Sequence, residues 1–240
     1  RDLNFRSKEF RGLEVINSCE IKAEIEGIKI EILGYFLDTS DPNLQRLIER
    51  IEKFRVERME EMVQNVNKAV KPEITLEHVK KVSKGSLARP NLAKVMVNKS
   101  VVESVAEAFE KYISKEKSCY VKTKKLSAKE VIQAVHKNKG VTSLSHPGRN
   151  LPEDRAEELI SKLVNFGLDA LEVNYPYDLI GKANSEEMNF TSEKAEKLAD
   201  KFDLLKTGGS DSHGTKSDKD FLGEVKIPYK QVKALKSLRK

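Results

Sequence analysis

The sequence predicts an α/β fold that is interrupted by an all-helical insertion. Three observations carry this prediction. Two segments near the N-terminus alternate apolar and polar residues, the stretch 41–118 is almost entirely helical in pattern, and short apolar runs alternate with amphipathic helices from residue 119 onward. Helices of this length join parallel strands through right-handed crossovers. We therefore expect a mainly parallel sheet or barrel from residues 1–40 and 119–240, with residues 41–118 as a helical insertion subdomain.

The composition is that of a charge-rich protein with enough apolar sequence for a core. The chain has 240 residues, of which 38% are hydrophobic and 34% are charged. No run approaches the roughly 18 apolar residues that a membrane span needs. The start, Arg1-Asp2-Leu3-Asn4, does not resemble a signal peptide. Cys19 and Cys119 lack metal-ligand spacing and are expected to be free thiols. These features predict a cytoplasmic protein without a membrane partner.

The net charge of +6 suits an anionic substrate or a loose contact with nucleic acid. Lys and Glu are also interleaved along helical faces, which is typical of ordinary solvation. The charge therefore leaves both interpretations open.

The first elements form a predicted hairpin. The apolar residues 13–16 indicate a short strand, and residues 21–26 and 28–33 alternate around the turn signal Glu26-Gly27. Asp41-Pro42-Asn43 then starts a long helix with apolar residues three and four apart, which ends at Lys71-Pro72. Shorter helices are expected after Thr75, after Pro90 and over 101–113, with His78 at the surface.

The βα alternation resumes at a capping box, Ser127-Ala128-Lys129-Glu130. The predicted elements then follow in this order: a helix to about Lys139 with His136 exposed, a strand at 141–144, a helix at 154–166, a strand at 168–175, a helix at 192–201, a strand at 202–205, an extended piece at 220–226 and a basic helix at 228–240.

Polar residues follow several of these strands. Glu20, His146, Tyr175, Asp211 and His213 all fall at or just after predicted strand ends. A carboxylate and an imidazole two residues apart can bind one divalent cation. Alternatively, Asp211 caps a turn and His213 lies at the surface. Function in βα folds gathers at strand ends, so the convergence favours a metal site.

Six segments, taken in order, resemble the PHP (polymerase and histidinol phosphatase) family, in its subgroup of small metal-dependent phosphoesterases with a helical insertion. The resemblance covers nearly the whole chain. The segments are Gly12-Leu13-Glu14-Val15-Ile16 with Cys19-Glu20-Ile21, Glu31-Ile32-Leu33-Gly34-Tyr35, Ala88-Arg89-Pro90-Asn91-Leu92-Ala93, Ser145-His146-Pro147-Gly148-Arg149, Leu171-Glu172-Val173-Asn174-Tyr175-Pro176 and Gly209-Ser210-Asp211-Ser212-His213-Gly214.

The resemblance implies a distorted (β/α)7 barrel with two or three divalent metals (Mn, Mg, Zn or Fe) at its rim. It also implies hydrolysis of phosphate esters in nucleotides, oligonucleotides or small metabolites. The residues to which it assigns catalytic and metal-binding roles are Glu20, His146, Asp211 and His213, with Asn91 as a further metal ligand and Arg89 and Arg149 as substrate-binding residues.

The sequence departs from the family pattern at three places. The family begins with strands that carry a His-x-His pair and an Asp-His pair, whereas the first histidine here is His78. We therefore expect missing N-terminal strands and fewer metals than in a full-length relative. Asn91 stands in the Arg-Pro-His segment, and an amide oxygen is a poor ligand for zinc or iron. Glu31 stands where relatives often have a histidine, so its role as a ligand is less clear.

Two alternatives to a complete phosphoesterase remain open. The chain could be a degenerate, non-catalytic PHP scaffold that binds a nucleotide, nucleic acid or a partner protein. The site could also be completed elsewhere, because unpaired sheet edges rarely stay exposed. A second chain or a homo-oligomer would then cover the missing strands. The expected partners are a phosphorylated small molecule or a nucleic-acid end.

Overall fold

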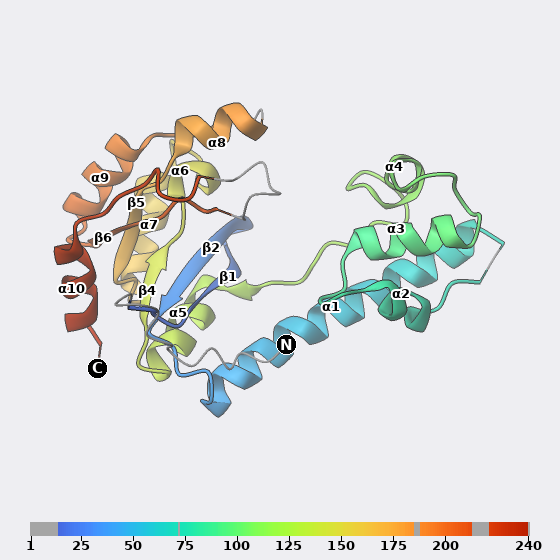
Figure 1. Cartoon of the computed structure of the whole chain (residues 1–240), viewed down its shortest axis with the longest axis horizontal. Helices are drawn as coiled ribbons and strands as arrows, with labels where there is room; N and C mark the ends of the chain where they lie inside the picture. Colours follow the sequence, from blue (N-terminus) through green and yellow to red (C-terminus); the bar gives the residue numbers. More distant parts are fainter. Residues whose placement is uncertain (1–13, 72, 185–187, 213–220, 240) are drawn as a thin grey trace. The chain divides into compact units, whose positions relative to one another are not determined.

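The computed structural model describes residues 14–71, 73–184, 188–212 and 221–239. The chain divides into two compact units (Figure 1). Residues 46–125 form a helical unit, and the segments that end at Gln45 and begin at Leu126 form an α/β unit. Among the described residues, no helix is both long and apolar enough to cross a membrane.

The α/β unit is built on one six-stranded sheet in the order β3-β1-β2-β4-β5-β6. Its strands are β1 (Ser18–Ile25), β2 (Ile28–Tyr35), β3 (Leu126–Ser127), β4 (Val141–Leu144), β5 (Ala170–Asn174) and β6 (Leu205–Gly208). The pairs β1-β3, β4-β5 and β5-β6 are parallel, whereas β1-β2 and β2-β4 are antiparallel. The α/β class is confirmed. The described sheet is open, and a (β/α)7 barrel is not confirmed.

The predicted hairpin is confirmed. Glu26 and Gly27 both have positive φ, 49° and 80°, as a tight two-residue hairpin turn requires. This turn pairs Ile25 with Ile28 and fixes the register of the whole ladder. The prediction of a strand at 13–16 is wrong for the residues that the structure describes, because residues 14–17 are not a strand and β1 begins at Ser18. Glu20 therefore lies inside β1.

Helices connect and cover the strands. They are α5 (Ala128–Lys137), α6 (Pro147–Asn150), α7 (Ala156–Asn165), α8 (Tyr177–Asn184), α9 (Ser192–Lys201) and α10 (Tyr229–Ser237). The capping box at Ser127 and Glu130 is confirmed. Ile32, Leu144 and Leu171 are fully buried on neighbouring strands and anchor the core. The extended piece expected at 220–226 contains no strand in its described residues.

The helical unit has its own core. Its helices are α1 (Pro42–Ala69, of which residues 46–69 belong to this unit), α2 (Leu76–Val82), α3 (Arg89–Asn98), α4 (Val105–Ala108) and the π-helical turn η1 (Phe109–Ile113). Met62, Leu92 and Met96 are completely buried in one cluster. The helix expected from 101 starts four residues later, because Ser104 caps α4 by accepting a hydrogen bond from the Glu107 N–H.

Candidate metal centre

Two carboxylates and one imidazole meet on three adjacent strands of the α/β unit. Glu20 lies on β1, Glu31 on β2, and His146 two residues beyond β4. The antiparallel pairing of β2 with β4 sets Ile32 opposite Leu144, which carries His146 toward Glu31. His146 Nε2 lies 3.0 Å from Glu31 Oε2 and 3.3 Å from Glu20 Oε1. The sheet topology therefore creates this cluster.

Further hydrogen bonds hold the side chains of this cluster in place. Glu172, on β5, is buried, and its Oε2 accepts hydrogen bonds from the His146 N–H at 2.8 Å and from Ser145 Oγ at 3.3 Å. Ser145 Oγ also lies 3.0 Å from Glu20 Oε1. Asn150 Nδ2 lies 3.0 Å from His146 Nδ1, the ring nitrogen that faces away from the carboxylates. Both ring nitrogens of the imidazole therefore have polar partners.

The shifted pKa values of His146, Glu31 and Glu172 reflect the negative charge gathered in this cluster. Burial opposes a charge on His146, but its hydrogen bonds to Glu20 and Glu31 outweigh burial and raise its pKa to about 9. The hydrogen bond with His146 lowers the pKa of Glu31 to about 2. Burial raises the pKa of Glu172 to about 7. A cation is therefore favoured between Glu20 and Glu31.

The donor set fits a divalent metal. One ligand atom from each of Glu20, Glu31 and His146 lies within 4.8 Å of the other two. Carboxylate oxygens suit Mg²⁺ and Mn²⁺, and imidazole suits zinc and iron, so a mixed set accommodates several divalent ions. The chemistry thus supports a divalent metal without selecting one.

The backbone at His146 is in a conformation that few residues adopt. Its φ is 26°, in the left-handed region, and Pro147 begins α6 immediately afterwards. Such strain costs on the order of 1–3 kcal/mol and persists where surrounding contacts enforce it. The Glu172 hydrogen bond to the His146 N–H is one such contact.

Tyr175 connects His146 to Asp211. Its ring centroid lies 5.2 Å from that of His146, and its hydroxyl donates a hydrogen bond of 3.0 Å to Asp211 Oδ2. Asp211 follows β6 with a positive φ of 49°. Of the predicted pair, Asp211 therefore lies beside the ring that contacts His146. His213 lies outside the described residues.

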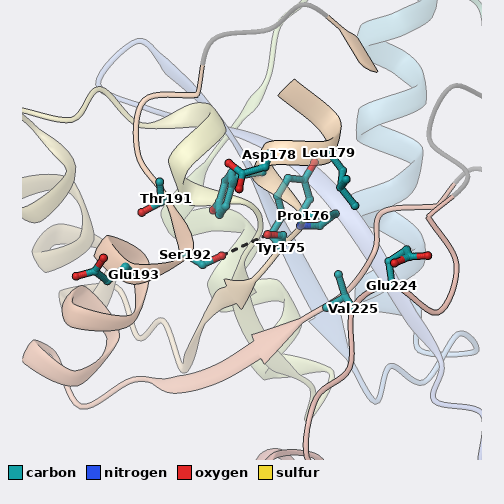
Figure 2. Close-up of a pocket in the computed structure, with 10 residues that line it drawn as sticks. Tyr175, Pro176, Asp178, Leu179, Thr191, Ser192, Glu193, Glu224 and Val225 are labelled. Atoms are coloured by element: carbon teal, nitrogen blue, oxygen red, sulfur yellow. Dashed lines mark hydrogen bonds between the residues drawn. The ribbon is translucent and has the colours of Figure 1, made fainter. Parts of the chain in front are cut away.

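A pocket of about 380 Å³ is lined by the start of α8, the start of α9 and the segment at Glu224 and Val225, with Tyr175 among its lining residues (Figure 2). Tyr175 and Tyr177 form part of its wall, with ring centroids 4.8 Å apart. Ser192 Oγ donates to the Tyr175 carbonyl oxygen at 3.3 Å, which joins α9 to the end of β5 (Figure 2).

Three further predicted residues have different surroundings. Arg149 lies on α6, three residues after His146. Arg89 and Asn91 belong to the helical unit, at the first turn of α3. The Asn91 Oδ1 accepts the Ala88 N–H at 2.9 Å and so caps that helix. This hydrogen bond gives Asn91 a structural role.

Local sequence patterns give Glu31 no clear role and single out neither Glu172 nor Ser145. A signal is present for Glu172, because it is a lone charge inside the otherwise apolar strand Ala170–Asn174. Charges are rarely buried without partners, so such a residue marks a site. Glu31 can be recognised only from the pairing of β2 with β4, which a local pattern does not contain.

Comparison with curated proteins finds similarity to three proteins named 5′-3′ exoribonuclease. The chain is 26% identical over 203 residues to a 5′-3′ exoribonuclease of Haemophilus influenzae, covering 84% of this chain and 70% of that protein. It is 27% identical over 169 residues to the 5′-3′ exoribonuclease Rnm of Escherichia coli, covering 70% of this chain but only 57% of the relative. No family model matches the chain.

Two solved structures share the fold. A provisionally assigned metal-dependent phosphoesterase from Bifidobacterium adolescentis has a TM-score of 0.70 at 27% identity, covering 95% of this chain and 78% of that one. An amidohydrolase from Chromobacterium violaceum has a TM-score of 0.64 at 20% identity, covering 93% and 76%, and shows the fold alone. The motif order, the curated relatives and the first of these structures agree, and together they support the resemblance of this chain to the PHP family of metal-dependent phosphoesterases.

Proposed function

We propose that this chain is a metal-dependent hydrolase of phosphate esters. The observation that carries the proposal is the cluster of Glu20, Glu31 and His146, in which three ligand atoms converge on one point from three strands. A divalent ion bound there would supply a water of lowered pKa and neutralise charge on the phosphate. The similarity to a provisionally assigned metal-dependent phosphoesterase supports the same activity.

The finer part of the proposal concerns the substrate. The curated relatives are named 5′-3′ exoribonucleases, and we propose that this chain likewise acts on the phosphodiester bond nearest the 5′ end of RNA. Hydrolysis there adds one water across a P–O bond, leaving a phosphate on one product and a hydroxyl on the other. A small phosphorylated metabolite is the competing substrate class.

The remaining roles follow from the family resemblance and the local contacts. Asp211 and His213 would complete the metal ligands, with Tyr175 orienting Asp211 through their 3.0 Å hydrogen bond. Ser145 would hold Glu20 in position. Arg149, which is close in sequence to His146, would bind a substrate phosphate. Arg89, which lies in the insertion, would bind a second phosphate. Residues 41–118 would form that insertion within a distorted (β/α)7 barrel.

Metal titration tests the proposed centre. His146→Ala and Glu31→Gln each remove one ligand, and we expect each to weaken Mn²⁺ binding roughly tenfold or more. Glu157→Gln is the matched control, because Glu157 is an exposed carboxylate on α7. Calorimetry at constant pH measures the affinity. The proposal predicts unchanged binding in the control and loss in both ligand variants.

Activity is tested with a 5′-phosphorylated oligoribonucleotide and Mn²⁺, with product lengths followed by electrophoresis. We expect stepwise loss of nucleotides from the 5′ end by the wild type and none by His146→Ala. Metal binding without turnover of this RNA or of a small phosphate ester would contradict the catalytic proposal. That result would instead favour the non-catalytic scaffold.

A further inference from the structure

Two arginines of the helical unit contact the same tyrosine. Arg58, on α1, and Arg89, on α3, each place the guanidinium carbon 5.5 Å from the ring centroid of Tyr120. Arg89 also lies 5.2 Å from the ring centroid of Phe109. All of these residues belong to residues 46–125, so both guanidinium groups pack against the same ring within one unit.

Neither arginine forms an ion pair with a carboxylate among the residues that the structure describes. Arg58 Nε donates to the Val121 carbonyl oxygen at 2.7 Å, and Arg89 Nη1 donates to the Ile113 carbonyl oxygen at 3.2 Å. A guanidinium group carries five N–H donors. Most donors of both groups are therefore left for solvent or for a ligand.

Two other arginines in the described part of the chain do form ion pairs with carboxylates. Arg55 lies 2.6 Å from Glu52, and Arg155 pairs with both Glu26 and Glu158. Arg58 and Arg89 are both half-buried, and burial lowers the pKa of Arg58, with a smaller contribution from the positive charge of Arg89. Two half-buried cations without a counter-charge gain from an anion that contacts both.

The charge of the helical unit indicates the class of anion. Residues 46–125 contain 19 Lys and Arg against 11 Glu and no Asp, a net charge of +8, whereas the whole chain carries +6. The positive charge is thus concentrated in the unit that holds the arginine pair. A guanidinium group matches a phosphate through two parallel hydrogen bonds, which an ammonium group cannot form.

We propose that Arg58 and Arg89 bind a backbone phosphate of a single-stranded nucleic acid on the helical unit. The choice of a nucleic acid over free phosphate rests on the proposed function. Tyr120 is the platform that holds the two guanidinium groups in place.

The test is fluorescence anisotropy with a labelled, 5′-phosphorylated ten-nucleotide oligouridylate, in EDTA so that no hydrolysis occurs. We expect Arg58→Gln and Arg89→Gln each to weaken binding severalfold and the double variant to weaken it roughly tenfold or more. The dependence of log K on log salt should become shallower by roughly 0.7 for each phosphate that a variant no longer neutralises. Lys94→Gln, which removes an exposed charge from α3, should stay within twofold.

Inorganic phosphate and a 5′-mononucleotide distinguish the source of the phosphate. We expect millimolar concentrations of either to displace the oligonucleotide only weakly, because a strand makes several contacts at once. An arginine-dependent affinity for free phosphate that equals the affinity for the strand would overturn the assignment to nucleic acid. Binding by the double variant that matches Lys94→Gln would overturn the site itself.

The arginines also stack on aromatic rings, so their removal could disturb the fold. Arg58→Lys and Arg89→Lys keep the charge and remove only the planar fork, and we expect severalfold weaker binding from each. If the Gln variants lose their far-ultraviolet circular dichroism, wild-type affinity in both Lys variants overturns the proposal. Arginine-dependent binding by a wild type that hydrolyses no RNA would refute the proposed catalysis and leave this site standing.

Discussion

At the scale of single residues, His146 shows how a sheet specifies a site. Its ring has carboxylates on one side and Asn150 on the other, and its own N–H donates to Glu172. Each of these partners comes from a different segment of the α/β unit. The residue type was recognisable from the sequence, because His146 follows a strand, whereas the partners that position it depend on strand pairing.

Asp169 lies in a second, half-buried polar cluster of the same unit. Its Oδ2 accepts hydrogen bonds from the Thr142 N–H at 2.8 Å and Thr142 Oγ1 at 2.7 Å, and it lies 2.8 Å from His136 Nε2. His136, expected to be exposed, is 35% exposed and contacts this carboxylate. Burial disfavours the Asp169 charge, but the contacts with His136 and Thr142 outweigh it and lower its pKa.

Replacing this carboxylate should cost stability in a pH-dependent way. We expect Asp169→Asn to lower the free energy of unfolding at pH 7 by about 1–3 kcal/mol. Because the folded pKa is depressed, the contribution is fully present above the unfolded value of about 3.9 and is lost as pH falls through the folded pKa. The wild type and variant should therefore converge below about pH 4.

Urea denaturation at a series of pH values measures this difference. Asp154→Asn, which removes an exposed carboxylate, is the control and should track the wild type throughout. A stability difference for Asp169→Asn that stays constant with pH would show that the Asp169 charge contributes nothing.

At the scale of elements, Gly148 explains how α6 packs. A Cβ at this position would lie 2.1 Å from the Phe190 carbonyl oxygen and 2.9 Å from Tyr177 Cε1. The Gly148 N–H donates to the Tyr177 hydroxyl at 3.0 Å, so the close approach is part of a hydrogen-bonded contact. The glycine therefore brings the segment after His146 directly against the chain at Phe190.

Adding a methyl group here should force the two segments apart. We expect Gly148→Ala to destabilise the fold by about 1–3 kcal/mol and to weaken Mn²⁺ binding, because His146 lies two residues away. Urea denaturation and calorimetry check the two effects. Gly209→Ala is the steric control for stability, since its Cβ would meet Glu172 Oε1 at an ordinary 3.5 Å. Equal stability of the two variants would contradict the packing argument.

At the scale of the whole molecule, the hydrophobic core of the helical unit and the candidate metal centre lie in different units. Met62 is completely buried in the core of the helical unit, whereas Glu20, Glu31 and His146 belong to the α/β unit. The charge is also unevenly distributed, since residues 46–125 carry a net charge of +8 whereas the whole chain carries +6. These facts favour separate tasks for the two units.

A cavity in the helical core should therefore leave the metal centre intact. We expect Met62→Ala to destabilise the helical unit by roughly 2–5 kcal/mol, with hydrogen exchange increasing within residues 46–125. Mn²⁺ affinity should stay within twofold of the wild type. Met62→Leu, which conserves volume, should cost under about 1.5 kcal/mol. Equal loss of protection in β4 and β5 would show that the two units unfold together.

Local sequence signals predicted the elements that depend on short-range chemistry. The Glu26-Gly27 turn indicated the hairpin, because only a few residues tolerate positive φ there, and Ser127 with Glu130 indicated the start of α5. The antiparallel pairing of β2 with β4 was not predicted, because parallel and antiparallel strands share the same apolar pattern.

The sequence by itself determined the α/β class, the hairpin and the resemblance to the PHP family, and it singled out Glu20, His146 and Asp211 as candidate site residues. Only the tertiary structure decided that Glu31 faces His146, that Glu172 supports it, and that Arg58 and Arg89 share Tyr120. The physical reason is the range of the interactions. Turns and caps are set by neighbours in the chain, whereas a binding site is set by side chains that folding brings together from distant segments.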